Sequence, residues 1–392
     1  MLKNMKINYK MILILLIPTL GMVIFAGSSL SSNHQVSKEM RATQQMVTLA
    51  VDVENLVHEL QKERGLSAGF ISSRAGKFKP DLLAQREKTE DGRKELFRFL
   101  DSNQRALTTV ADPLRSALAQ LETLGQTRSA VDGLAIAPPV SFRYFTDLIG
   151  TLQDVVAEIV SVSNNTDIMS SAFAYLAFTN QKEFAGQERA TVNAALAAGH
   201  FDREGYERYV RILSAQDTHY RNFARFVDKQ LLKEYGDKYA NSPQYRRIDE
   251  VRAGLLGIGT GGDLAIAPEV WFRDSTQKIN LMKEFEDQLA AHVTDISTRT
   301  ADAARRSFVL SLVLTVIFAV LTFGLALVML LSITRSLTAL VGMMQEIARG
   351  EGDMNRRMTV DRKDEFGQLS YWFNQFVDKI QANVAKLVAS LR

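Results

Sequence analysis

Two arginines in matching positions are the side chains in this sequence best suited to bind a ligand. Arg64 lies in the segment QKERGLSAGF at 61–70, and Arg189 lies in GQERATVNAA at 186–195, an offset of 125 residues. Arg64 continues an apolar stripe with helical spacing, which predicts that it points into a helical bundle. A guanidinium in such a core requires an anion or a carboxylate as its partner.

Two interpretations of this pair remain open at the level of sequence. The arginines clamp a small anion with their planar, forked donors. Alternatively, each arginine pairs with a core acid, and Glu63 and Glu188 stand directly beside them as candidates.

A second pair, Arg143 and Arg273, is a weaker candidate for ligand binding. These arginines lie in LAIAPPVSFRYFT and LAIAPEVWFRDST, two segments related by an offset of 130 residues. The alternative is a repeated helix start, because a proline in each segment suits the first turn of a helix.

Other kinds of chemistry find no support in the sequence. The chain has no cysteine, which excludes thiol catalysis and thiolate metal sites, and its five histidines are scattered. GxSxG at 65–69 and GxGxxG at 257–262 lack the preceding strand that their functions need. We therefore predict no catalytic residue, no metal and no cofactor, and a protein that is not an enzyme.

The region that carries both arginine pairs is predicted to be helical and duplicated. Strand patterns are almost absent, and apolar residues recur at spacings of three and four along a long helix. This stripe consists of Met46, Leu49, Val53, Leu56 and Leu60. The two offsets indicate two copies of a helical bundle, with a ligand site on the seam between them.

Two uncharged, apolar runs at 11–30 and 307–332 are long enough to cross a membrane. Lys3, Lys6 and Lys10 precede the first run and favour a cytoplasmic tail at 1–10, which would leave residues 31–306 outside the cytoplasm. A cleaved signal peptide is the alternative for the first run.

The charge balance argues against a nucleic-acid partner. The tail holds three bases and no acid, and residues 333–392 hold nine bases and seven acids. Of the 47 bases and 44 acids of the chain, 35 bases and 37 acids therefore remain for the rest of the chain. A region without excess positive charge attracts anions only through local donors.

Residues 333–385 contain two short amphipathic stretches joined by a polar connector. Neither stretch can bury its apolar stripe alone, and a parallel four-helix coiled coil from two chains would bury both. The segment resembles the HAMP signal-relay domain, with Asp364, Glu365 and Gly367 at the signature that opens the second helix. Residues 386–392 would begin a further coiled coil.

The outer region resembles the nitrate- and nitrite-sensing domain family. The resemblance rests on LQKERGLSAGFISSRAGKF, RYFTDLIGTLQDVVAEIV and KEFAGQERATVNAALAAGHFD, and spans most of residues 50–290. It implies an all-α fold of two packed four-helix bundles that bind nitrate or nitrite between them, with Arg64 and Arg189 at the family's inward arginines.

These features together predict a homodimeric receptor of the bacterial inner membrane with a periplasmic sensor domain. Its relay segment resembles that of methyl-accepting chemotaxis proteins, whose kinase and adaptor bind a signalling domain not found in residues 1–392. We expect a chain cut after the relay, the alternative being a short natural protein. Other possibilities are the input half of a sensor histidine kinase or diguanylate cyclase, a receptor for an organic acid or amino acid, and a purely structural membrane protein.

Overall fold

The computed structural model describes residues 7–103, 110–161, 165–260, 264, 266–349, 356–361 and 363–390. Every regular element among these residues is a helix, which confirms the predicted all-α fold. The elements are α1 (Ile7–Ser72), α2 (Lys79–Ser102), α3 (Ala111–Glu122), α4 (Leu124–Asp132), α5 (Pro138–Ser161), α6 (Thr166–Ala198), α7 (Arg203–Phe226), α8 (Lys229–Glu234), η3 (Tyr235–Ala240), α9 (Pro243–Ile258), α10 (Pro268–Ala348) and α11 (Glu365–Ser390).

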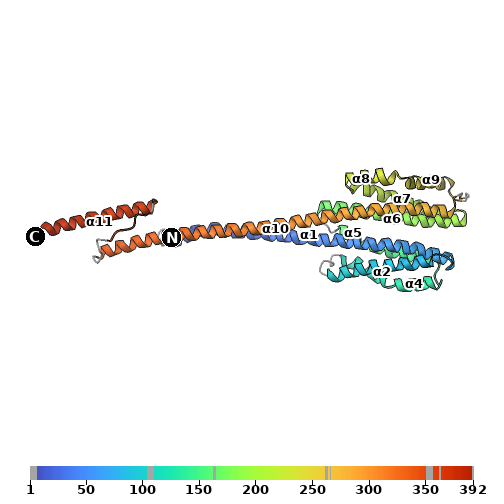
Figure 1. Cartoon of the computed structure of the whole chain (residues 1–392), viewed down its shortest axis with the longest axis horizontal. Coiled ribbons are helices and arrows are strands. Elements are labelled where there is room, and N and C mark those ends of the chain that lie inside the picture. The colour runs from blue at the N-terminus through green and yellow to red at the C-terminus, as the bar shows by residue number, and fades with distance from the viewer. Residues whose placement is uncertain are drawn as a thin grey trace. The chain divides into compact units, whose positions relative to one another are not determined.

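The chain forms two compact units, residues 35–305 and residues 1–34 with 306–392. The first of these, the sensor unit, contains two groups of helices (Figure 1). One group packs α2 to α5 against α1, and the other packs α7, α8, η3 and α9 against α6 and α10. The sensor unit is therefore a duplicated helical bundle.

The cores of the two bundles differ in composition. The stripe predicted from Met46 to Leu60 is buried in the first bundle among aliphatic residues from α2, α3 and α5. The second bundle instead packs aromatic rings edge to face, with Phe178 at 5.1 Å from Phe223 and 5.2 Å from Phe285. Both arrangements bury one face of each helix, as amphipathic patterns require.

Local signals fix where the helices of the seam begin. α5 and α10 start at Pro138 and Pro268, which have no backbone N–H to leave unpaired in the first turn. α6 starts after Asn165, whose side chain accepts hydrogen bonds from the backbone N–H groups of Asp167 and Ile168. The repeated LAIAP segments thus do mark helix starts.

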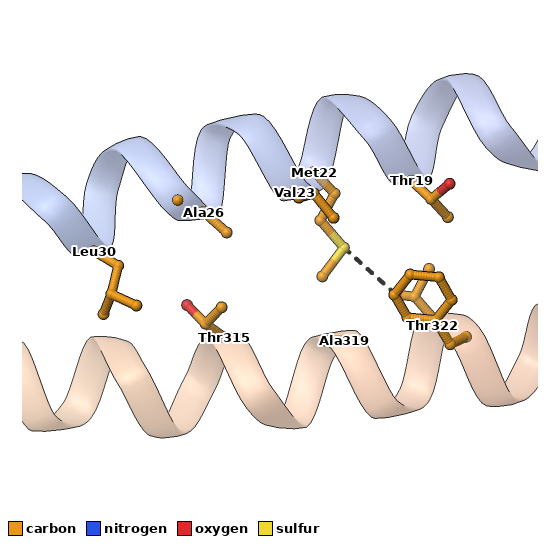
Figure 2. A pocket seen from close by; sticks show the side chains of 10 residues that line it. Thr19, Met22, Val23, Ala26, Leu30, Thr315, Ala319 and Thr322 are labelled. Carbon is orange, nitrogen blue, oxygen red and sulfur yellow. Dashed lines mark hydrogen bonds between the residues drawn. The ribbon is translucent and has the colours of Figure 1, made fainter.

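The second unit, which we call the membrane unit, holds the two apolar runs. α1 and α10 are both long and apolar enough to cross a membrane. Within this unit the two runs face each other across a gap that contains no charged side chain (Figure 2). The gap is lined by Thr19, Met22, Val23, Ala26, Gly27, Leu30, Thr315, Ala319, Thr322 and Phe323.

The same unit includes the relay segment. Asp364 caps α11 by accepting a hydrogen bond from the backbone N–H of Gly367 at 3.1 Å, and Glu365 begins the helix. Asn374 of α11 bonds both the N–H and the C=O of Met358, which ties the connector to the helix. The cap explains why an acid stands at position 364, directly before α11.

Candidate functional site

Arg64 is buried at the seam of the two bundles, where it lies against both copies. It is 2% exposed. Its Nη1 donates to Thr146 Oγ1 of α5 at 2.9 Å, and its guanidinium stacks 4.6 Å from the centre of the Phe142 ring. Its fork also binds Glu183 of α6, at 2.6 Å to Oε1 and 3.0 Å to Oε2.

Arg189 repeats the first two of these contacts in the second copy. Its Nη1 donates to Thr276 Oγ1 of α10 at 2.9 Å, and its guanidinium lies 5.1 Å from the centre of the Phe272 ring. Among the residues that the structure describes, no carboxylate lies within ion-pair distance of it. Desolvation and the Arg64 charge lower the pKa of Arg189 to about 10, and Glu183 opposes this change.

Two glycines bring the guanidinium groups close to the facing helix. A Cβ at Gly65 of α1 would lie 3.5 Å from Arg189 Nη2, and a Cβ at Gly186 of α6 would lie 3.2 Å from Arg64 Nη2. Each arginine therefore crosses the seam toward the helix that carries the other. The Gly65 of the GxSxG pattern thus supports packing of the arginine pair, Arg64 and Arg189, and not a nucleophile.

The acids beside the two arginines have other partners. Glu63 accepts two hydrogen bonds from Arg128 of α4, at 2.7 and 2.8 Å. Glu188 accepts two from Arg252 of α9, at 2.7 and 2.6 Å. The suggestion that Glu63 and Glu188 neutralise the arginine pair is therefore wrong, since neighbours on a helix point to different faces.

Arg143 and Arg273 are not brought to this site. Both side chains are exposed, and Arg273 donates to the adjacent Asp274 at 3.0 Å. Their repeated segments do contribute contacts to the arginine pair. Phe142 and Thr146 contact Arg64, and Phe272 and Thr276 contact Arg189.

Sequence reasoning did not identify Glu183, the acid that pairs with Arg64. It lies 119 residues from its partner in the chain. A signal was present, because the offset of 125 that relates Arg64 to Arg189 places His58 opposite Glu183. This comparison would have shown that one copy has an acid where the other has none.

The arrangement can bind an anion by charge and by directed donors. Arg189 offers a desolvated guanidinium with one hydrogen bond to protein, and the two threonines and two aromatic faces orient the pair. No cluster able to hold a metal occurs among the described residues.

Two family models match the chain. Residues 55–294 match the family described as nitrate and nitrite sensing, and residues 328–382 match the HAMP domain. The chain belongs to the nitrate and nitrite sensing family. It combines this sensing domain with a HAMP domain, as signal-transducing receptors do.

Individual relatives are similar to this chain over stretches of different length. The methyl-accepting chemotaxis protein McpA of Pseudomonas putida is 38% identical over 93 residues, 24% of this chain and 14% of that protein. The nitrate regulatory protein of Klebsiella oxytoca is 22% identical over 253 residues, 64% of this chain and 63% of that protein. The chain thus spans less than two thirds of either relative.

A solved structure shares the fold. The structure of the NasR transcription antiterminator superposes with a TM-score of 0.63 at 19% identity, covering 92% of this chain and 98% of that one. At this identity the likeness concerns the fold alone.

Proposed function

We propose that the protein is a receptor of the bacterial inner membrane that binds nitrate or nitrite at the arginine pair. The observation that carries the proposal is the desolvated guanidinium of Arg189, which has no carboxylate partner among the described residues. A desolvated cation without a counter-ion is costly unless an anion binds beside it. Nitrate and nitrite are planar oxyanions that suit the forked donors of arginine.

The proposed topology places the tail at 1–10 and the relay at 333–385 in the cytoplasm, and the sensor at 31–306 in the periplasm. The spans would be residues 11–30 and 307–332, and residues 386–392 would begin a signalling coiled coil. The lysines before the first run and the two apolar helices support this arrangement.

The proposed signal passes from the sensor through the second span to the HAMP relay of a homodimer. Leu369 and Phe376 of α11 are 43% and 51% exposed in a single chain, so a second chain would cover them. Binding shifts the relay only if the ligand contacts its two states unequally, with a coupling of about 1–3 kcal/mol. A kinase and an adaptor would bind a signalling domain beyond these residues.

Calorimetric titration of the full chain in lipid nanodiscs tests ligand binding. Sodium nitrate and sodium nitrite should bind, and the Arg189→Ala variant should bind neither. Arg143→Ala is the matched control, since its side chain is exposed and outside the site. Absence of binding to the wild-type chain, or equal binding to Arg189→Ala, would refute the proposal.

Cysteine labelling tests the topology, because the chain has no native cysteine. Ser32→Cys should react with an impermeant maleimide in intact cells, and Gln375→Cys should react only after lysis. Both positions are exposed. The reverse pattern would show that the orientation is wrong.

A further inference from the structure

Glu183 makes the two sides of the arginine pair electrically unequal. Its carboxylate is buried, 4% exposed, and binds both Nη atoms of Arg64. Within the described part of the chain, Arg189 has no such partner. The three groups together carry one net positive charge.

Glu183 is also held in place by neutral donors. Gln61 of α1 donates to Oε2 at 2.8 Å, and Gln187 of α6 donates to Oε1 at 2.8 Å. With the two bonds from Arg64, the carboxylate accepts four hydrogen bonds. A ligand that displaced Glu183 from Arg64 would leave a buried charge without its counter-ion. The ligand is therefore expected on the Arg189 side, with Glu183 still in place.

The first copy supplies no matching acid. His58 occupies the position that corresponds to Glu183 at the offset of 125. Burial, assisted by Lys182, Lys62 and Lys283, lowers the pKa of His58 far below its ordinary value, so the ring is neutral. The single negative charge of the site thus comes from the second copy.

We propose that Glu183 selects the charge of the ligand. It neutralises Arg64 and leaves one positive charge, which a singly charged anion balances. A doubly charged anion such as sulfate would leave a net negative charge in a desolvated seam, which is unfavourable. This inference rests on the proposed function, since it concerns the ligand of the same arginine pair.

The test is calorimetric titration of the full chain in nanodiscs with sodium nitrate and with sodium sulfate. The wild-type chain should bind nitrate at least about 100-fold more tightly than sulfate. Glu183→Gln keeps the shape and the hydrogen-bonding oxygen but removes the charge. It should reduce the preference for nitrate at least about tenfold.

Glu188→Gln is the matched control variant. Glu188 is a buried acid on the same helix, 2% exposed, but it pairs with Arg252 and not with the arginine pair. Its loss should lower stability and leave the ratio of nitrate to sulfate affinity within about twofold of the wild-type ratio.

The outcomes separate this inference from the proposed function. If the wild-type chain binds neither nitrate nor nitrite, the proposed function is wrong and charge selection falls with it. If the wild-type chain binds nitrate and sulfate equally, or Glu183→Gln keeps the wild-type preference, charge selection is wrong while nitrate sensing stands. The wild-type comparison needs no variant, so it remains decisive even if Glu183→Gln fails to fold.

Discussion

The two bundles of the sensor unit present the same three residue types to the seam but differ in charge. Arg64, Thr146 and Phe142 of the first copy make the same contacts as Arg189, Thr276 and Phe272 of the second. Among the residues that the structure describes, only the first arginine pairs with a carboxylate, that of Glu183, and this acid belongs to the other copy. Duplication thus supplied the geometry of the site, and a single divergent position supplied its electrostatic polarity.

A second set of contacts has remained equal in the two copies. The pairs of Glu63 with Arg128 and of Glu188 with Arg252 are both bidentate and nearly buried. They join the central helices α1 and α6 to the outer helices α4 and α9. The Glu63–Arg128 and Glu188–Arg252 ion pairs therefore hold the bundles together, whereas the arginine pair is available to a ligand.

The largest expected effect comes from removing each arginine in turn. Arg64→Ala leaves Glu183 buried without its counter-ion and should lower the free energy of unfolding by about 3–5 kcal/mol. Arg189→Ala removes an unpaired cation and one hydrogen bond, so the change should stay under about 1 kcal/mol. Thermal unfolding of the full chain in detergent, followed by circular dichroism, measures both. Equal losses would show that the two sides are not electrically different.

The next effect concerns the pairs that the copies share. Arg252→Ala removes the arginine that pairs with buried Glu188 and should cost about 3 kcal/mol of stability. Arg128→Ala should cost less, because Arg86 still lies 3.5 Å from Glu63. The same unfolding measurement applies. A loss of stability for Arg128→Ala that equals or exceeds the loss for Arg252→Ala would contradict this order.

A gradual effect, smaller per pH unit than the losses above, is expected from pH through Glu54 of the first copy. Burial and the nearby Glu286 raise the pKa of Glu54 from 4.5 to about 8, against the opposing effects of Lys182, Thr179 and Lys283. The folded state therefore keeps a proton that the unfolded state loses, and stability falls as the pH rises from about 4.5 toward 8.

Glu54→Gln should remove this contribution, because the amide does not titrate. Its stability relative to the wild-type chain should increase with pH, by at most about 1.4 kcal/mol per pH unit. Unfolding at pH 5, 7 and 9 measures the difference. A difference that does not depend on pH would contradict the protonated state of Glu54.

The smallest effect comes from the two glycines of the seam. Gly65→Ala places a Cβ at an ordinary contact distance of 3.5 Å from Arg189, so the higher helix propensity of alanine should raise stability by about 0.5–1 kcal/mol. Gly186→Ala meets Arg64 at 3.2 Å, and the displaced ion pair should cancel that gain. The melting temperatures of the two variants test this order. A larger gain in stability for Gly186→Ala than for Gly65→Ala would contradict the prediction.

Much of the fold could be predicted from local patterns in the sequence. Helical periodicity from Met46 to Leu60 gave the buried face of α1, and the uncharged runs gave the apolar stretches of α1 and α10. Repeated segments revealed the duplication because homologous copies keep matching residues at fixed offsets. Arg143 and Arg273, the weaker candidates, are exposed and lie outside the arginine pair, because the same repetition also marks the start of a helix.

Sequence alone determined the helical periods and the inward direction of Arg64, because both depend on residues close together in the chain. It also determined the composition, and it revealed the duplication through segments that repeat at fixed offsets. Tertiary structure alone decided which acid neutralises which arginine. Glu63 turned toward Arg128, and Arg64 met Glu183 from another helix, because the rotation and register of packed helices set these partners. Spacing along one helix does not contain that information, and so the pairing of Glu183 with Arg64 emerges only in the folded sensor.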